Sequence, residues 1–164
     1  IAGCVPLSAD HQRCLLITSR HYPNHLVFPK GGIKRRETAQ QAAARETWEE
    51  CGALGVVDDE IQLESLGVVG DLVVDDQQEE SDLEDDFEVL EVDDQQQGDN
   101  RKGERWFEMT VERVEDEYPE KGQRLRQWHF VKEARHLHNL RPKTRYLLDA
   151  IHRLYHRLDE PGSQ

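Results

Sequence analysis

The sequence contains no apolar run long enough to cross a membrane, and no signal peptide is recognisable in it. Cysteine is scarce, because only Cys4, Cys14 and Cys51 are present, an odd number in apolar surroundings. This composition favours buried thiols in a reducing compartment. We therefore expect no membrane association and a location in the cytoplasm, with the nucleus as an alternative. A targeting segment upstream of Ile1 would be invisible in this sequence.

Basic residues are absent from residues 75–99, which contain 13 Asp and Glu without a single Lys or Arg. This segment accounts for the formal net charge of −13, because the rest of the chain has 21 acidic and 21 basic residues. A formally neutral remainder does not argue against a phosphate substrate. The composition is typical of a solvated insertion, at about residues 75–100, in a single domain spanning residues 1–164. Its FEVLEV run could instead add an edge strand, or the segment could bind a basic protein partner.

Apolar and β-branched runs predict a sheet of short strands. These runs are found at residues 1–7, 13–19, 25–32, 53–57, 61–74, 103–114 and 124–131. Pro29 is expected to end the third run just before a glycine pair. Residues 143–158 repeat apolar side chains at helical spacing and predict an amphipathic helix that packs on the sheet.

A second helix is expected to begin after Thr38 and to end at Gly52. Thr38 and Gln41 have the spacing of a capping box, in which both side chains satisfy backbone donors at the helix start, and a glycine is a common helix stop. One side of this helix is mostly apolar and should face the core; it consists of Ala44, Thr47, Trp48 and Cys51.

The other side of this helix carries Glu46, Glu49 and Glu50. At about 3.6 residues per turn, the i, i+3 and i+4 spacing puts the three carboxylates on one face. Such a face is often simply solvated and paired with Lys or Arg. Three clustered carboxylates nevertheless repel one another unless a cation lies between them, and oxygen ligands suit Mg²⁺ or Mn²⁺. The pattern therefore indicates a metal site.

Gly31 is followed after five residues by Glu37, and after seven more by the run RETWEECGA, which begins at Arg45. This pattern resembles the box motif of the Nudix hydrolases. Thr47 and Ala53 stand where the family usually has bulky aliphatic residues. The resemblance implies an α/β fold, namely an α/β/α sandwich with a mixed β-sheet, a central catalytic loop and helix, and a C-terminal packing helix.

The resemblance also implies a division of roles. Glu46 and Glu50 would be the principal ligands of Mg²⁺, with Mn²⁺ as an alternative, helped by the backbone carbonyl of Lys30. Glu49 would be the general base or a further metal ligand. Glu37 and Arg45 would support the ligands through an ion pair.

Longer stretches of the chain carry a second resemblance, and these are VFPKGGI, RETWEECGA, ERWFEMTV, EYPEKGQRLRQWHF and LRPKTRYLLDAI. They resemble one branch of that family, the diphosphoinositol polyphosphate phosphohydrolases, and especially its fungal members. The branch implies removal of the β-phosphate from diphosphoinositol polyphosphates, with diadenosine polyphosphates and inorganic polyphosphate as further substrates. The expected partners are thus small polyphosphorylated molecules and not nucleic acid, and we expect a monomer.

The resemblance points to substrate contacts from residues on separate strands and loops. They are Thr18, Arg20, Lys30, Gly31, Gly32, Arg105, Arg126 and Arg141. Lys30 departs from the branch, which usually has glycine there, and could add a phosphate contact. Arg124, Arg126 and Trp128 should share one face if residues 124–131 form a regular strand.

Two other functions are open at this point. A dinucleotide-specific or mRNA-cap-type pyrophosphatase would need aromatic side chains on both sides of a base, and the candidates are Tyr22, Trp106, Tyr118 and Trp128. A non-enzymatic module could use the acidic segment to bind basic proteins, although the intact set of three glutamates argues against this reading.

Overall fold

The computed structural model describes residues 1–62 and 103–156. The acidic segment at residues 75–99 and the end of the expected helix at 143–158 lie outside the described residues. The strands are β1 (Ala2–Leu7), β2 (Arg13–Thr18), β3 (Leu26–Val27), β4 (Lys30–Gly31), β5 (Ala53–Glu60), β6 (Arg105–Val114) and β7 (Arg126–Phe130). The helices are α1 (Ala39–Cys51), α3 (Val131–Ala134) and α4 (Pro142–Tyr155).

Strand β1 lies at the centre of the sheet. The strand order is β3-β2-β1-β6-β5, with β4 also paired to β1 and β7 also paired to β2. Strand β1 runs parallel to β6, whereas the other pairs are antiparallel, so the sheet is mixed. All six residues of β1 are buried, as expected for a strand covered on both faces.

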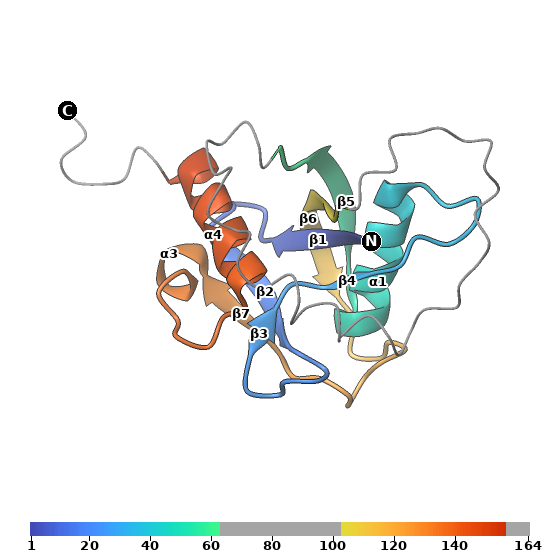
Figure 1. Cartoon of the computed structure of the whole chain (residues 1–164), viewed down its shortest axis with the longest axis horizontal. Helices are drawn as coiled ribbons and strands as arrows, with labels where there is room; N and C mark the ends of the chain where they lie inside the picture. The colour runs from blue at the N-terminus through green and yellow to red at the C-terminus, as the bar shows by residue number, and fades with distance from the viewer. Residues whose placement is uncertain (63–102, 157–164) are drawn as a thin grey trace.

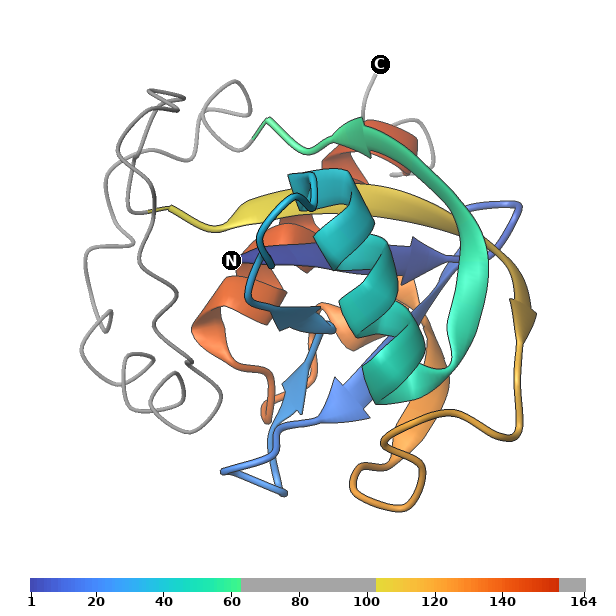
Figure 2. The same ribbon diagram turned by 90° about the vertical axis from the view of Figure 1, so that its right-hand side faces the viewer.

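Helices cover the two faces of this sheet (Figures 1 and 2). Alternate residues of β1 and β2 point to opposite faces. Cys4 and Ile17 pack in one cluster with Ala43 of α1, whereas Leu7 and Leu16 pack in the other with apolar residues of α4. The expected α/β fold, an α/β/α sandwich with a mixed sheet, a central loop and helix and a C-terminal packing helix, is confirmed.

The three cysteines are free and buried within these two clusters. Burial raises the pKa of each thiol to about 12, so the thiols stay protonated at neutral pH. None of the helices in the described part of the chain is long and apolar enough to span a membrane.

The expected strand at residues 25–32 is divided into β3 and β4. Pro29 cannot donate a hydrogen bond to a neighbouring strand, and its carbonyl instead accepts one from the Cys4 amide at 3.2 Å. Strand β3 pairs with β2, whereas β4 pairs with β1. The break therefore moves the chain from one neighbour to the next, and it directs Gly31 toward α1.

Several expected boundaries were wrong. Strand β5 extends beyond residue 57 because it pairs with the long strand β6 as far as Glu60, through two irregularities in register. The expected strand at 61–74 does not begin at Ile61, which lies after β5, and its remainder lies outside the described residues. Val131 belongs to the short helix α3 and not to the preceding strand, and its amide donates to the Gln12 carbonyl at 2.9 Å.

Candidate metal-binding and catalytic site

Helix α1 is fixed at both ends by the residues that the sequence indicated. The Gln41 amide donates to Thr38 Oγ1 at 3.1 Å, and the Thr38 amide donates to Gln41 Oε1 at 2.9 Å. Gly52 has a φ of 69°, in the left-handed region that favours glycine, and its amide donates to the Trp48 carbonyl. The predicted capping box and glycine stop are confirmed. They fix where α1 begins and ends, and therefore which of its residues face the loop that contains Gly31 and Gly32.

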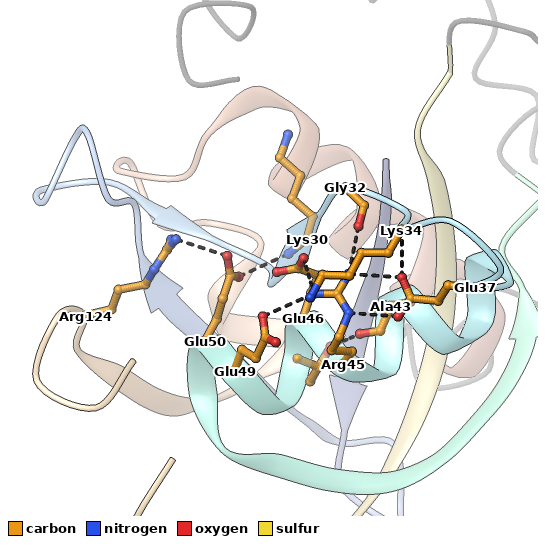
Figure 3. Close-up of polar contacts among 11 residues, drawn as sticks. Lys30, Gly32, Lys34, Glu37, Ala43, Arg45, Glu46, Glu49, Glu50 and Arg124 are labelled. Atoms are coloured by element: carbon orange, nitrogen blue, oxygen red, sulfur yellow. Dashed lines mark hydrogen bonds and ion pairs between the residues drawn. The ribbon is translucent and has the colours of Figure 1, made fainter. Parts of the chain in front are cut away.

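The carboxylate of Glu46 lies directly against the backbone of Gly31 (Figure 3 shows the surrounding residues). A methyl group at Gly31 would lie 2.1 Å from Glu46 Cδ and 2.3 Å from its Oε1, which is too close for real atoms. The same addition at Gly32 would meet nothing within 4 Å. Only the first glycine of the pair is thus required by close packing in the structure.

Arg45 connects the loop to the acidic face. Its Nε donates to Glu37 Oε1 at 2.8 Å and its Nη2 donates to Glu37 Oε2 at 3.1 Å, so the expected ion pair is bidentate. Its Nη1 donates to Glu46 at 2.7 Å and to Glu49 at 3.2 Å. Nη2 also donates to the Gly32 carbonyl at 2.8 Å. The guanidinium therefore positions two of the three glutamates, and the hydrogen bond from Arg45 lowers the pKa of Glu37.

Glu50 is the most deeply buried of the three glutamates. The exposed fractions of the side chains are 9% for Glu50, 15% for Glu46 and 32% for Glu49. Glu50 Oε2 accepts from the Lys30 amide at 3.2 Å, and Oε1 accepts from Arg124 Nη2 at 3.0 Å. Burial raises the pKa of Glu50 to about 8, with Arg124 acting in the opposite direction. Burial also raises the pKa of Glu46, against the effect of Arg45.

The donor set has the chemistry that a hard divalent cation prefers. Three carboxylates and the backbone of Lys30 supply only oxygen ligands, as Mg²⁺ requires. In the structure these carboxylates are turned toward Arg45 and Arg124 (Figure 3). Accordingly, within residues 1–62 and 103–156, no three His, Cys, Asp or Glu side chains converge on a common metal position. The three glutamates have the ligand chemistry that a divalent cation prefers, and they lie on one face of α1. Their side chains would have to rotate to bind the cation together.

Two of the expected substrate residues lie next to the Glu50 side of this face. Thr18 Oγ1 accepts from the Leu125 amide at 3.0 Å, and the Thr18 carbonyl accepts from Arg124 Nη1 at 3.5 Å. Arg20 Nη2 donates to Gln123 Oε1 at 3.4 Å. The end of β2 is thereby joined to residues 123–125, which carry Arg124.

Arg124 contacts the acidic face through Glu50, although it was not among the expected substrate residues. The signal was present in the RLRQW run, where both arginines were expected to share a strand face. Strand β7 begins only at Arg126, so the alternation of a regular strand does not extend back to Arg124. The guanidinium of Arg124 reaches Glu50, whereas that of Arg126 does not.

Arg126 instead closes the C-terminal end of α1. Its Nη1 donates to the carbonyls of Cys51 and Glu115, both at 2.7 Å, and its guanidinium lies 4.6 Å from the centre of the Tyr118 ring. The expectation that Arg124 and Arg126 share one face is therefore wrong, because their guanidinium groups make separate sets of contacts. The last carbonyls of a helix lack partners within the helix, and a nearby cation satisfies them.

The other expected cations form contacts away from the three glutamates. Arg105 makes two hydrogen bonds of 2.9 Å to Glu60 at the end of β5. Arg141 lies over the Tyr22 ring, with 4.7 Å between the guanidinium carbon and the ring centre. The Lys30 ammonium donates to Glu104 at 2.6 Å, although the Lys30 amide contacts Glu50.

Comparison with known proteins decides the family. A model of the NUDIX domain matches residues 1–151 of the chain. The chain belongs to the Nudix family. A crystal structure of a Nudix-family hydrolase from Clostridium perfringens has the same fold, with a TM-score of 0.52 and 15% identity over 93% of this chain and 95% of that chain.

Two curated Nudix relatives match shorter regions. Mitochondrial Nudix hydrolase 16 of Arabidopsis thaliana is 38% identical over 71 residues, which cover 36% of this chain and 39% of the relative. Diphosphoinositol polyphosphate phosphohydrolase 2 of Rattus norvegicus is 36% identical over 55 residues, which cover 33% of this chain and 31% of the relative. The matches thus span about a third of the length of these relatives.

The two departures from the Nudix box are accommodated in the core. Thr47 and Ala53 are fully buried. The Thr47 hydroxyl donates to the Ala43 carbonyl at 2.7 Å, one helical turn earlier, so its polar atom is satisfied within the helix. These positions therefore serve packing, as the sequence indicated, and leave the acidic face unchanged.

The contact between Gly31 and Glu46 generates a matched pair of variants. We expect Gly31→Ala to displace the Glu46 carboxylate and to weaken Mn²⁺ binding by about tenfold. Gly32→Ala, which adds the same methyl group in open space, should keep the affinity of the parent protein. Calorimetric titration with Mn²⁺ measures both, with circular dichroism to show that the variants are folded. Equal affinity in the two variants would show that Gly31 does not position Glu46.

Proposed function

We propose that this Nudix protein is a Mg²⁺-dependent phosphoanhydride hydrolase, with Mn²⁺ as an alternative cation. The observation that carries the proposal is the placement of three carboxylates on one face of α1, with the Gly31 backbone packed against one of them. Membership of the family supports the same activity. Glu46 and Glu50 would hold the cation together with the Lys30 carbonyl.

Hydrolysis of a phosphoanhydride requires a deprotonated water and neutralisation of the charge that grows on the phosphoryl oxygens. A bound divalent cation lowers the pKa of water and polarises the phosphoryl group. Glu49 is the most exposed of the three glutamates and is suited to take the proton from the attacking water, or to serve as a further ligand. Arg45 holds Glu46 and Glu49 in place, and Glu37 in turn holds Arg45.

We further propose diphosphoinositol polyphosphates as the principal substrate class, with diadenosine polyphosphates and inorganic polyphosphate as secondary substrates. The name of the rat relative supports this class. A densely phosphorylated ring requires several convergent cations, and arginine binds phosphate through two parallel hydrogen bonds. Arg124 contacts Glu50 and Arg20 contacts Gln123, the neighbour of Arg124 in the chain, so these two arginines are our candidates for contacts with such phosphates.

The surroundings of the aromatic residues favour this class over a base-specific enzyme. Trp106 is 3% exposed and belongs to the core on the α4 side of the sheet. The Arg126 guanidinium lies over one face of the Tyr118 ring, and the Arg141 guanidinium lies over the Tyr22 ring, which is 36% exposed. Trp128 is packed against the core on the α1 side. These four candidates for stacking on a base are therefore already in contact with other side chains.

The activity is tested by Mg²⁺-dependent phosphate release from diphosphoinositol, diadenosine and inorganic polyphosphates. We expect Glu49→Gln and Glu50→Gln each to lower kcat on the order of 10²- to 10⁴-fold, because each removes a negative charge needed to bind the cation or to accept a proton. Chelation of divalent metal should abolish turnover by the parent protein. Near-normal kcat in both folded variants at saturating Mg²⁺ would exclude the proposed site.

The substrate class is tested by comparing Arg124→Ala with the matched control Arg126→Ala. At saturating Mg²⁺, we expect Arg124→Ala to raise KM for a diphosphoinositol polyphosphate about tenfold, and to raise it less for a diadenosine polyphosphate. Arg126→Ala should leave the ratio of the two KM values unchanged and should lower the free energy of unfolding by about 1–3 kcal/mol.

Steady-state kinetics on both substrates and urea unfolding of both variants provide the comparison. If Arg124→Ala raises the two KM values equally, the preference for inositol substrates is not supported, and diadenosine polyphosphates become the better candidate.

A further inference from the structure

Lys30 has its two ends on opposite faces of the sheet. Its backbone amide donates to Glu50 Oε2 on the α1 side at 3.2 Å. Its ammonium donates to Glu104 Oε1 at 2.6 Å. Glu104 also accepts from the indole of Trp106, which belongs to the core on the α4 side. Lys30 therefore connects the acidic face of α1 to a polar cluster on the α4 side of the sheet.

Glu104 is the centre of that polar cluster. Its Oε2 accepts from Trp106 Nε1 at 3.0 Å and lies 3.8 Å from the ammonium of Lys143 in α4. The exposed fraction of its side chain is 16%, and those of Lys30 and Lys143 are 26% and 27%. Burial by itself would raise the pKa of Glu104, but the two lysines and the indole lower it below its usual value. The carboxylate is thus held ionised, with partners from three separate elements.

Close packing restricts the path of the Lys30 side chain. In the sheet, Gly3 of β1 is paired with Lys30 on one side and with Trp106 on the other. A methyl group at Gly3 would lie 2.5 Å from Trp106 Cζ3 and 2.9 Å from Lys30 Cβ. The absence of a side chain at Gly3 allows Lys30 and Trp106 to approach each other over β1 and to reach the same carboxylate.

We propose that Glu104 is a positioning residue for the metal site, and this inference rests on the proposed function. Glu104 holds the Lys30 ammonium on the α4 side of the sheet and thereby fixes the position of the Lys30 backbone. The amide of that backbone contacts Glu50, and its carbonyl would face the cation. Groups that orient the metal ligands through hydrogen bonds affect metal affinity even though they do not contact the metal. Lys30 then acts through its backbone, and its ammonium is not a phosphate ligand.

A double-mutant cycle on metal affinity tests the proposal. The variants are Lys30→Met, which keeps an unbranched apolar side chain as far as Cε but removes the ammonium, Glu104→Gln, which keeps the shape of the side chain, and the double variant. We expect each single variant to weaken Mn²⁺ binding by about tenfold, and the double variant to be weakened by about tenfold as well, since the two residues act as one unit. Lys30→Arg should recover part of the affinity, and KM for the substrate should stay within twofold of the parent value.

A control separates positioning from general loss of stability. Asp149→Asn breaks the pair between Arg135 and Asp149, in which the exposed fractions are 25% and 38%, at a place that touches neither Lys30 nor the three glutamates. This variant should keep the Mn²⁺ affinity of the parent protein even if its unfolding midpoint falls. Binding is measured by titration calorimetry and by the electron paramagnetic resonance signal of free Mn²⁺, and folding by circular dichroism.

The outcomes distinguish the inference from the proposed function. If the parent protein binds Mn²⁺ and both single variants bind it within twofold of the parent, Glu104 does not position the site and the inference is overturned. A raised KM with unchanged Mn²⁺ affinity in Lys30→Met would also overturn it and would make Lys30 a phosphate ligand. If the parent protein itself neither binds Mn²⁺ nor needs a divalent metal for turnover, the proposed function has failed.

Discussion

The repulsion among three carboxylates on one helix face is the constraint on which the rest of the site depends. Glu46, Glu49 and Glu50 lie within one turn and a half of α1, and two of them are largely buried. Arg45 compensates two of these charges, and Arg124 compensates the third. Hydrogen bonds between charged groups are each worth about 1.5–3 kcal/mol, so the paired arrangement is stable, whereas the same carboxylates without cations would not be. A cation bound to this face would take the place of Arg124 at Glu50, whereas Arg45 would keep its contacts with Glu46 and Glu49.

The sheet provides the geometry that brings these charges together. Parallel pairing of β1 with β6 and antiparallel pairing with β4 place Gly31 beside the centre of the sheet, where α1 covers it. The cations come from a different direction, because Arg20 and Arg124 belong to the linked segments after β2 and before β7. Arg20 and Arg124 are therefore carried by elements other than α1, which allows these two residues to vary without change to the helix that carries the three glutamates.

The local features of the fold could be predicted from the sequence because they depend on neighbouring residues. The capping box at Thr38, the stop at Gly52 and the shared face of the three glutamates follow from spacing along one helix, and the structure has all of them. The strand break at Pro29 was located correctly, but the return to pairing at Lys30 and Gly31 was not, since it depends on the position of β1.

The contacts of the long basic side chains could not be predicted in the same way, because they depend on residues far away in the sequence. A change of one residue in strand register moves a side chain to the other face of a sheet, and the sequence alone did not give the start of β7. Arg126 was therefore expected to share a face with Arg124, whereas in the structure Arg126 closes the end of α1 and Arg124 contacts Glu50. The ammonium of Lys30 was likewise expected near phosphate, but tertiary packing over Gly3 directs it to Glu104.

The position of a bound metal is the most direct test of this account. Crystals grown with Mn²⁺ would give an anomalous scattering signal at the metal. We expect a peak between the carboxylates of Glu46 and Glu50 and the carbonyl of Lys30, with the Arg124 guanidinium moved away from Glu50. A peak elsewhere at saturating Mn²⁺, with Glu50 still bonded to Arg124, would contradict this expectation.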